Sequence, residues 1–152
     1  MTTPSAAVSL PIGADASAGA VPSEVAQNAV AFPDGIPGFE SCRQFVLVAS
    51  DEIAPLQRLH SIQGPSANFV GIDPRLVLPS YRCHLSDHDL RVLDAQPDTT
   101  LLWLAIVTVE TDGTAVANLR APIVINPERM LGRQVLPDEG LYPIRHVLSP
   151  GA

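Results

Sequence analysis

The sequence predicts an all-β fold, a small antiparallel β-barrel-like domain with one short helix near residues 86–95. Its apolar runs are short and rich in β-branched residues, and turn-forming residues separate them; the chain of 152 residues contains 15 prolines and 10 glycines. Only one segment carries the capping residues of a helix. Charged residues make up 16% of the chain, so few charges protect sheet edges, and closing the sheet into a barrel removes those edges.

The chain divides into a leading stretch and one domain. Residues 1–28 are rich in Ala, Ser, Pro and Gly, contain no arginine and show no apolar periodicity, which predicts a flexible extension. They lack the basic segment and the apolar core of a secretory signal peptide. A β-barrel-like domain is predicted over residues 29–149, and none of its apolar runs approaches the roughly 18 residues of a membrane-spanning helix.

Three strands are predicted in the first half of the domain. Residues 44–49, QFVLVA, form a compact apolar run that ends at a polar break. Residues 56–62 are ambiguous because leucine and isoleucine recur there at every third position, but Pro55 and Gly64 leave room only for a short element, which favours a strand. Residues 68–72, NFVGI, form the third strand.

The helix is predicted from its ends. Ser86 can cap its N-terminus, and Asp89 three positions later completes an approximate capping box, with Asp where Glu or Gln is usual. Leu90 and Leu93 then share one face, and Pro97 ends the segment.

The second half again reads as strands and turns. Residues 101–109 form a continuous apolar run, and the β-branched residues in its second part predict a central strand. Asp112-Gly113 follows as a hairpin signal, and we expect a type I′ turn because Asp tolerates the positive φ that Gly adopts readily. Further strands are predicted over residues 122–126, 133–136 and 142–148, with a turn at residues 137–140 between the last two.

The charge balance excludes one class of function and favours another. The formal net charge is −7, and all nine basic residues are arginine. Because nucleic-acid binding depends on neutralising phosphates with cations, this balance predicts no direct binding of RNA or DNA. An acidic surface suits a basic protein partner, although the same charge serves solubility equally well. Cys42 and Cys83, in a chain without a secretory signal, predict two reduced thiols and a cytoplasmic protein.

The best candidate for a metal site is the segment CHLSDH, residues 83–88, in which His84 and His88 lie four positions apart. Ser86 is expected to cap the helix, which leaves His84 before it, so the two imidazoles do not share a helical face. The sequence contains no GxSxG, Walker A or GxGxxG pattern. We therefore predict no metal, no cofactor and no enzymatic activity.

Residues 32–40, FPDGIPGFE, combine two glycines, two prolines and two carboxylates. The stretch from Gly35 to Gly38 fits the GxxG of a KH-type RNA clamp, but such clamps join helices, whereas this one leads into an apolar strand without a basic cluster. We interpret the segment as a tight turn in which Pro33 and Pro37 restrict φ and the two glycines adopt positive φ.

The side chains of this turn are expected to divide between core and surface. Phe32 and Phe39 would anchor its ends in the core, leaving Asp34, Ile36 and Glu40 exposed. A rigid exposed loop loses little entropy on binding, which suits recognition of a partner. The same residues also fit a turn with only a structural role, which is the simpler interpretation.

Several segments together resemble a known family. In order along the chain they are FPDGIPGFE, FVLV, NFVGIDP, LPSY, AIVTV, NLRAPIVIN and RQVL. This ordered set, from about residue 32 to residue 148, resembles the signature segments of FliW, the bacterial flagellar assembly factor. The opening loop and NLRAPIVIN, residues 118–126, are its most specific parts.

The resemblance implies a β-barrel-like cytoplasmic protein without enzymatic activity, monomeric when free. FliW-like proteins bind flagellin and also CsrA, the translational repressor of flagellin mRNA. Scarce flagellin would leave the protein free to hold CsrA, so translation proceeds. Accumulated flagellin would occupy the protein and release CsrA, so translation is repressed. The protein would thus act on RNA only indirectly, through a switch between two protein partners.

Partner contacts are expected, as a hypothesis, at positions that match the family motifs. They comprise the loop residues Asp34, Gly35, Ile36, Pro37, Gly38, Phe39 and Glu40, together with Asn118, Arg120 and Asn126. For the two asparagines, capping of strand ends through backbone hydrogen bonds is an alternative role that the residues themselves slightly favour. A rival function for the whole domain is a small β-barrel that binds an apolar small molecule in its interior.

Overall fold

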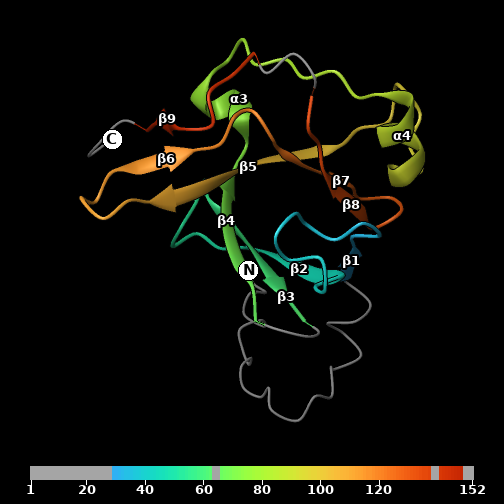
Figure 1. Cartoon of the computed structure of the whole chain (residues 1–152), viewed down its shortest axis with the longest axis horizontal. Helices are drawn as coiled ribbons and strands as arrows, with labels where there is room; N and C mark the ends of the chain where they lie inside the picture. The colour runs from blue at the N-terminus through green and yellow to red at the C-terminus, as the bar shows by residue number, and fades with distance from the viewer. Residues whose placement is uncertain (1–28, 63–65, 138–140, 149–152) are drawn as a thin grey trace.

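A closed ring of seven strands forms the body of the protein, as the computed structural model shows for the residues it describes, 29–62, 66–137 and 141–148. The ring runs β4-β3-β2-β1-β8-β7-β5, and β5 pairs back onto β4 (Figure 1). Two further strands, β6 and β9, continue outward from β5. The strands are β1 (Ala29–Ala31), β2 (Gln44–Ala49), β3 (Gln57–Ser61), β4 (Asn68–Ile72), β5 (Leu102–Val109), β6 (Ala115–Ala117), β7 (Ile123–Asn126), β8 (Leu131–Gln134) and β9 (His146–Val147), and the helices are α3 (Pro74–Val77) and α4 (Asp87–Leu93).

The predicted barrel is confirmed, but it is not wholly antiparallel. Among the described strands, the pairing of β1 with β8, through Ala31 and Leu131, is parallel, and the other pairings are antiparallel. The odd number of strands in the ring makes a parallel pair necessary. Each antiparallel pair reverses the strand direction, so a closed ring with an odd number of strands must contain at least one parallel pair. The correction follows from closure with seven strands.

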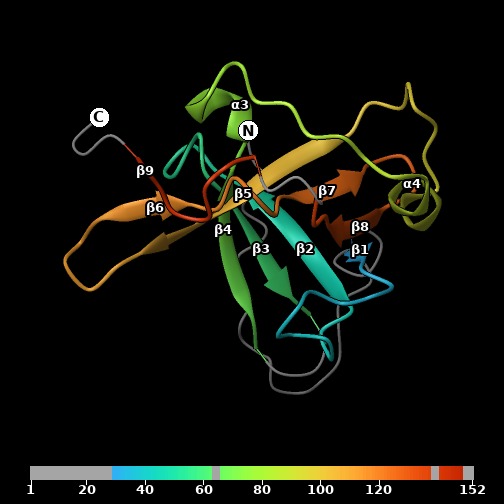
Figure 2. The same ribbon diagram turned by 45° about the horizontal axis from the view of Figure 1, so that its top comes forward.

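Strand β5 belongs both to the barrel and to the ribbon that leaves it. Its first residues, 102–104, pair with β7, its middle residues pair with β4, and its last residues, 107–109, pair with β6. Figures 1 and 2 both show the β5–β6 hairpin projecting away from the ring. The continuous apolar run predicted to be a central strand is therefore confirmed.

The interior of the barrel is filled by side chains. Phe32 and Phe45 meet edge to face with 5.1 Å between ring centroids. Gly132 is required beside them, because a Cβ there would lie 2.6 Å from Cζ of Phe32. The buried residues of this inner cluster are Val30, Phe32, Ile36, Cys42, Phe45, Leu59, Ala67, Leu104, Ile123 and Ile125.

The long connection between β4 and β5 covers the outside of the barrel wall. Tyr81 lies in a second buried cluster with Ile72, Ala105, Ala117 and Leu119, and its hydroxyl donates to the Leu119 carbonyl at 2.8 Å. Burial raises the pKa of the Tyr81 phenol, so it stays protonated at neutral pH. A third cluster, Leu93, Ala95, Val124 and Val135, lies under α4.

Helix α4 confirms the predicted helix and its capping box. The Asp89 amide donates to Ser86 Oγ, the Ser86 amide donates to Asp89 Oδ2, and both distances are 3.0 Å. Asp94 ends the helix in the left-handed conformation, with φ of 52°.

Helix α3 was not predicted. Its signal was the pair Asp73-Pro74, since the Asp73 side chain accepts from the Arg75 amide and proline occupies the first helical turn.

The hairpin at Asp112-Gly113 is confirmed, but the predicted type I′ turn is wrong. Gly113 has φ of 88°, whereas Asp112 does not have positive φ. The Gly113 amide donates to the Glu110 carbonyl, and the Glu110 amide donates to the Thr114 carbonyl, each at 2.8 Å. This is a three-residue loop, a type I turn followed by a glycine bulge. The extra residue is Thr111, which the dipeptide signal does not count.

Other boundaries differ by a few residues. Strand β8 begins two residues before the predicted 133–136, because Met130 adopts φ of 54° and turns the chain directly into it. Within the predicted strand 142–148, only His146 and Val147 form a strand. The predicted extension over residues 1–28 and most of the turn at 137–140 fall outside the described residues. In the part that is described, no helix is long and apolar enough to span a membrane.

Candidate functional site

The loop over residues 32–43 joins the C-terminal end of β1 to the N-terminal end of β2 as a series of tight turns. Amides of Gly35, Phe39 and Cys42 each donate to the carbonyl three residues earlier, at 2.8, 2.6 and 2.9 Å. Gly35 has φ of 70° and Gly38 has φ of 89°, as predicted. A Cβ on Gly35 would lie 2.7 Å from the Cα of Glu40, so the turn also closes over this position.

The expected exposure of two apolar side chains in this loop is reversed. Ile36 is 1% exposed and belongs to the inner cluster, whereas Phe39 is 42% exposed. The two residues pair across the turn at Pro37 and Gly38, yet only Ile36 packs among the residues of the inner cluster, and Phe39 lies outside it. Phe39 packs edge to face on Phe69, with 5.2 Å between ring centroids. Hydrophobicity alone does not distinguish these two positions, because both side chains are large and apolar.

Polar contacts hold the loop in this shape. Arg43 donates from Nε to the Glu40 carbonyl at 2.7 Å and from a terminal nitrogen to the Pro33 carbonyl at 2.6 Å. The Glu40 carboxylate accepts from the Gly38 amide at 3.1 Å. This backbone hydrogen bond is the main cause that lowers the pKa of Glu40, so the side chain is ionised at neutral pH.

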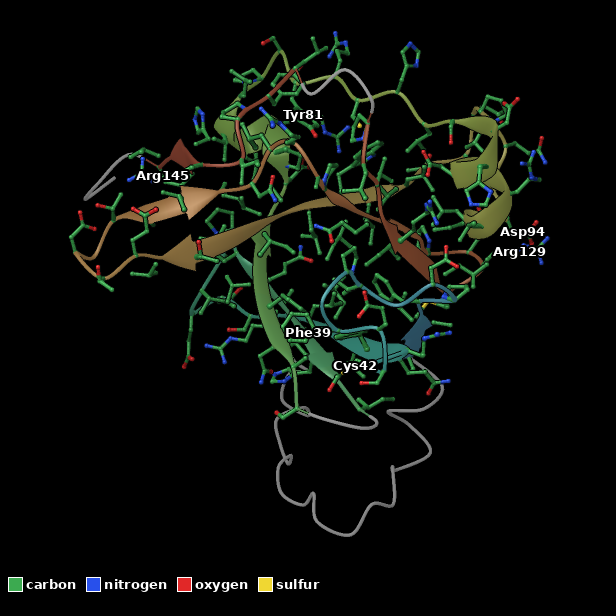
Figure 3. The ribbon with its side chains drawn as sticks, viewed as in Figure 1. Phe39, Cys42, Tyr81, Asp94, Arg129 and Arg145 are labelled. Atoms are coloured by element: carbon green, nitrogen blue, oxygen red, sulfur yellow. The ribbon has the colours of Figure 1, made fainter. Side chains whose placement is uncertain are left out.

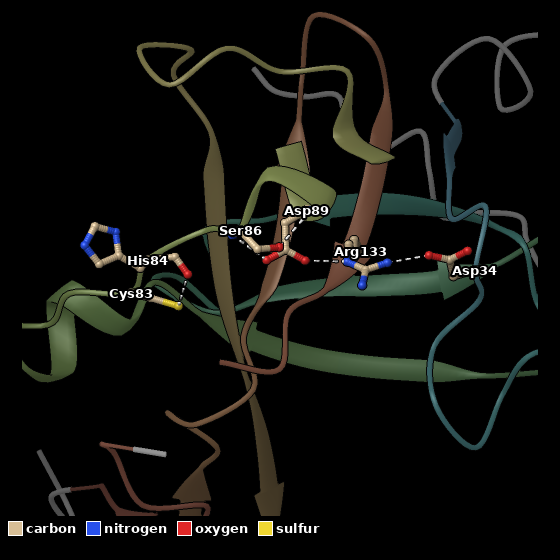
Figure 4. A network of polar contacts seen from close by, with 6 residues as sticks. All are labelled: Asp34, Cys83, His84, Ser86, Asp89 and Arg133. Carbon is tan, nitrogen blue, oxygen red and sulfur yellow. Dashed lines mark hydrogen bonds and ion pairs between the residues drawn. The ribbon is translucent and has the colours of Figure 1, made fainter. Parts of the chain in front are cut away.

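Arg133 on β8 connects the loop to α4. Its guanidinium donates to the Asp34 carboxylate and, from Nε, to Asp89 Oδ1 at 2.7 Å, as the dashed lines of Figure 4 show. Burial raises the pKa of Asp89, but hydrogen bonds from the Ser86 amide and from Arg133 outweigh it, and the pKa is lowered overall. One arginine thus fixes both the entry of the loop and the start of the helix.

The two asparagines predicted as contacts have the capping geometry of the alternative interpretation. Asn118 Oδ1 accepts from the Arg120 and Ala121 amides at 3.0 and 3.1 Å. Asn126 is 1% exposed, donates to the Leu93 and Asp94 carbonyls at 2.8 and 3.2 Å and accepts from the Glu128 amide. Asn126 therefore ties β7 to the end of α4 from inside the molecule.

The predicted contact residues do not form one surface. Arg120 donates to the Tyr142 carbonyl at 2.8 Å, and the Tyr142 ring stacks on Tyr81 with 4.5 Å between centroids. Figure 3 shows Tyr81 and Phe39 on opposite sides of the molecule. The loop residues are thus brought together at one place, and Arg120 lies elsewhere.

The segment that sequence analysis tested as a metal site has another role. Ser86 caps α4, and the Cys83 thiol contacts the His84 carbonyl at 3.9 Å (Figure 4). Among the described residues, His, Cys, Asp and Glu side chains form no group of three or more that could hold a metal ion.

Known proteins resemble this chain over most of its length. The family model described as "FliW protein" matches residues 17–148, which begins inside the stretch interpreted as an extension. "Flagellar assembly factor FliW" of Thermotoga sp. (strain RQ2) is 35% identical over 121 residues, 78% of this chain and 80% of that protein. The protein of the same name from Geobacillus sp. (strain WCH70) is 37% identical over 125 residues, 82% of this chain and 86% of its own.

The fold is shared with a solved structure. "Crystal structure of the flagellar assembly factor FliW" superposes with a TM-score of 0.74 and 37% sequence identity, covering 82% of this chain and 87% of that one. The relatives are matched over most of their length, so the likeness concerns whole domains.

Proposed function

This chain belongs to the FliW family and has a role in flagellar assembly, and on that premise we propose that it is a non-enzymatic regulator that binds flagellin and CsrA alternately. When flagellin is scarce, the free protein holds CsrA and the flagellin message is translated. When flagellin accumulates, it occupies the protein and CsrA is released. The exchange takes place in the cytoplasm, where both partners are made.

The loop over residues 32–43 is the observation that supports binding of a partner. It presents Phe39 as an exposed aromatic side chain on a backbone that tight turns, Arg43 and Arg133 already hold. An ordered loop loses little conformational entropy on binding, and exposed aromatic residues are common anchors of protein interfaces. Phe39 with the neighbouring Glu40 carboxylate offers one apolar and one anionic contact.

The charge of the chain supports CsrA as one of the two partners. The net charge is −7, and CsrA-type proteins have basic surfaces because they bind RNA. Opposite fields accelerate association and are screened by salt. Binding of CsrA should therefore weaken with ionic strength, and an apolar contact with flagellin should change less.

Isothermal titration with flagellin and CsrA from the same cell tests the proposal, followed by competition between them. We expect binding of each alone and displacement of CsrA by flagellin. Binding of flagellin alone would remove the switch and leave a chaperone-like role. Binding of neither would refute the proposed function, while the fold would stand.

Variants of the loop test where the partner binds. Phe39→Ser should weaken binding of at least one partner about tenfold or more, because it removes the exposed aromatic anchor. Leu141→Ser is the matched control, since Leu141 is also exposed but lies outside the loop. Equal affinities in the two variants would place the partner away from the loop.

A further inference from the structure

Arg133 on β8 lies between two carboxylates that belong to different elements. Its Nε donates to Asp89 Oδ1 of α4 at 2.7 Å, and a terminal nitrogen donates to Asp34 Oδ2 of the loop (Figure 4). The Arg133 side chain is 20% exposed and that of Asp89 is 10% exposed, whereas that of Asp34 is 56% exposed. A guanidinium is planar and rigid, so fixing one of its edges also sets where the remaining donors point. Asp89 therefore orients the donor that holds Asp34.

The loop is built so that its residues move together with Asp34. The Pro33 carbonyl, directly before Asp34, accepts from Arg43, and the same guanidinium donates to the Glu40 carbonyl. Directly after Asp34, Gly35 lies so close to Glu40 that a Cβ on the glycine would be 2.7 Å from the Glu40 Cα. Both neighbours of Asp34 are thus fixed to the segment around Glu40. A displacement of Asp34 is transmitted to that segment.

On the other side of Arg133, the Asp89 carboxylate is also part of the capping box of α4. Its Oδ2 accepts from the Ser86 amide while its Oδ1 accepts from Arg133, and the Asp89 amide donates to Ser86 Oγ. The capping box therefore fixes the side chain that orients the guanidinium. Opening of the box would release Asp89 and, with it, the orientation of Arg133.

We propose that Arg133 is a positioning residue through which the capping box of α4 controls the shape of the loop over residues 32–43. The contacts run from Ser86 to Asp89, from Asp89 to Arg133, and from Arg133 to Asp34. A helix outside the loop would thus regulate what the loop presents to a partner. The identity of that partner rests on the proposed function, whereas the coupling is a property of the free protein.

The coupling requires an arginine and not only a positive charge. One cation faces two carboxylates, and the guanidinium meets them with two different nitrogens. A lysine ammonium is a compact point charge on a flexible stem, without a second, rigidly oriented donor edge. Arg133→Lys should therefore keep the charge and lose the transmission from α4 to the loop.

Hydrogen exchange of the Cys42 amide, followed by NMR in the full-length protein without any partner, tests the coupling. This amide donates to the Phe39 carbonyl at 2.9 Å, so its exchange reports opening of the loop. Ser86→Ala removes the hydroxyl acceptor of the capping box and should accelerate this exchange at least about threefold. In the Arg133→Lys background, the same substitution should leave the exchange rate unchanged.

Ser50→Ala is the matched control. Ser50 Oγ accepts from the Glu52 amide at 3.1 Å, which is the same kind of hydrogen bond in the connection between β2 and β3. We expect no acceleration at Cys42 from this variant. Equal acceleration by the two serine variants would overturn the proposal, because the amide would then follow global stability. An acceleration by Ser86→Ala that persists in the Arg133→Lys background, or no acceleration at all, would also overturn it.

Titration with flagellin and with CsrA then separates the coupling from the proposed function. For the partner whose binding Phe39→Ser weakens, Ser86→Ala should lower the affinity at least about threefold, and Arg133→Lys should remove that sensitivity. If neither partner binds, the proposed function fails, while the exchange measurement still decides the coupling. Unchanged affinity in Ser86→Ala despite accelerated exchange would overturn control of the partner by α4.

Discussion

The two ends of the barrel are closed in opposite ways. At one end, the loop over residues 32–43 sends Phe32 and Ile36 into the inner cluster, and hydrogen bonds from Arg43 and Arg133 fix its course. At the other end, Leu76 and Leu102 remain exposed around a cleft, beside one exposed ion pair. The apolar side chains of the first end are buried in the core, whereas Leu76 and Leu102 at the second end are exposed to solvent. Substitutions at the first end should therefore lower the free energy of unfolding more than substitutions at the second.

The largest difference between the ends should come from truncating an apolar side chain at each. Ile36→Ala leaves a cavity in a packed interior and should lower the free energy of unfolding by about 2–5 kcal/mol. Leu76→Ala removes an exposed side chain and should change it by less than about 0.5 kcal/mol. Urea unfolding monitored by Trp103 fluorescence compares the two variants. Similar losses in both would mean that the open end is as integral to the core as the closed one.

The ion pair between Arg133 and Asp89 stabilises the closed end. Arg133→Met should lower the free energy of unfolding by about 1–3 kcal/mol at pH 7, because it leaves the mostly buried Asp89 carboxylate with only its capping contacts. The folded pKa of Asp89 lies below its unfolded value near 4, so this stabilisation is complete above that value and is lost as pH falls through the folded pKa. The difference in the free energy of unfolding between the parent and Arg133→Met should thus narrow as the pH falls below the unfolded pKa of about 4.

Arg91→Met is the control for that series. Arg91 is an exposed arginine on α4, and its replacement should shift stability little at any pH. If Arg133→Met lowers the free energy of unfolding by the same amount in acid as at pH 7, the arginine acts by packing and not through the Asp89 carboxylate.

Phe39→Ala, compared with Ile36→Ala, tests whether the exposed and the buried side chain of the same turn contribute differently to stability. Its ring packs on Phe69 but remains accessible, so the expected cost is about 1 kcal/mol, well below that of Ile36→Ala. Thermal unfolding of the two variants side by side measures the difference. A loss as large as that of Ile36→Ala would contradict the assignment of Phe39 to the surface.

The smallest effect should come from the ion pair at the open end. Asp73→Asn removes the partner of Arg75, and exposed pairs contribute about 0–1 kcal/mol, which salt reduces further. Urea unfolding at low salt and at 1 M NaCl should show a small loss that nearly vanishes in the concentrated salt. A loss of more than about 2 kcal/mol in the free energy of unfolding would instead mean that the Asp73 cap of α3 is essential for the stability of that end.

Local patterns predicted much of the fold because the relevant information was local. The run QFVLVA is strand β2 from its first residue to its last, and Ser86 with Asp89 forms the expected capping box. The parallel pair of β1 and β8 could not be predicted, since it depends on how many strands close the ring. The orientation of Ile36 and Phe39 was likewise set by tertiary packing at the barrel end.

The candidate site was only partly visible in the sequence. Glycine and proline spacing predicted the turn in FPDGIPGFE, with positive φ at Gly35 and Gly38. The cleft at the opposite end was missed because its residues come from three separate segments, and no local pattern joins Pro55, Leu76 and Leu102. Burial of Asn126 was also invisible, since an asparagine before a proline reads as an exposed turn.

The contact between Arg133 and Asp34 joins residues that are 99 positions apart. A ribosome adding about 5–20 residues per second needs about 5–20 seconds to make the second of them after the first. Until then the nascent chain has β1, β2 and the local contacts of the loop, but neither β8 nor the arginine that ties the loop to α4. A partner whose binding depends on this tie between the loop and α4 would thus recognise only chains whose synthesis is nearly complete.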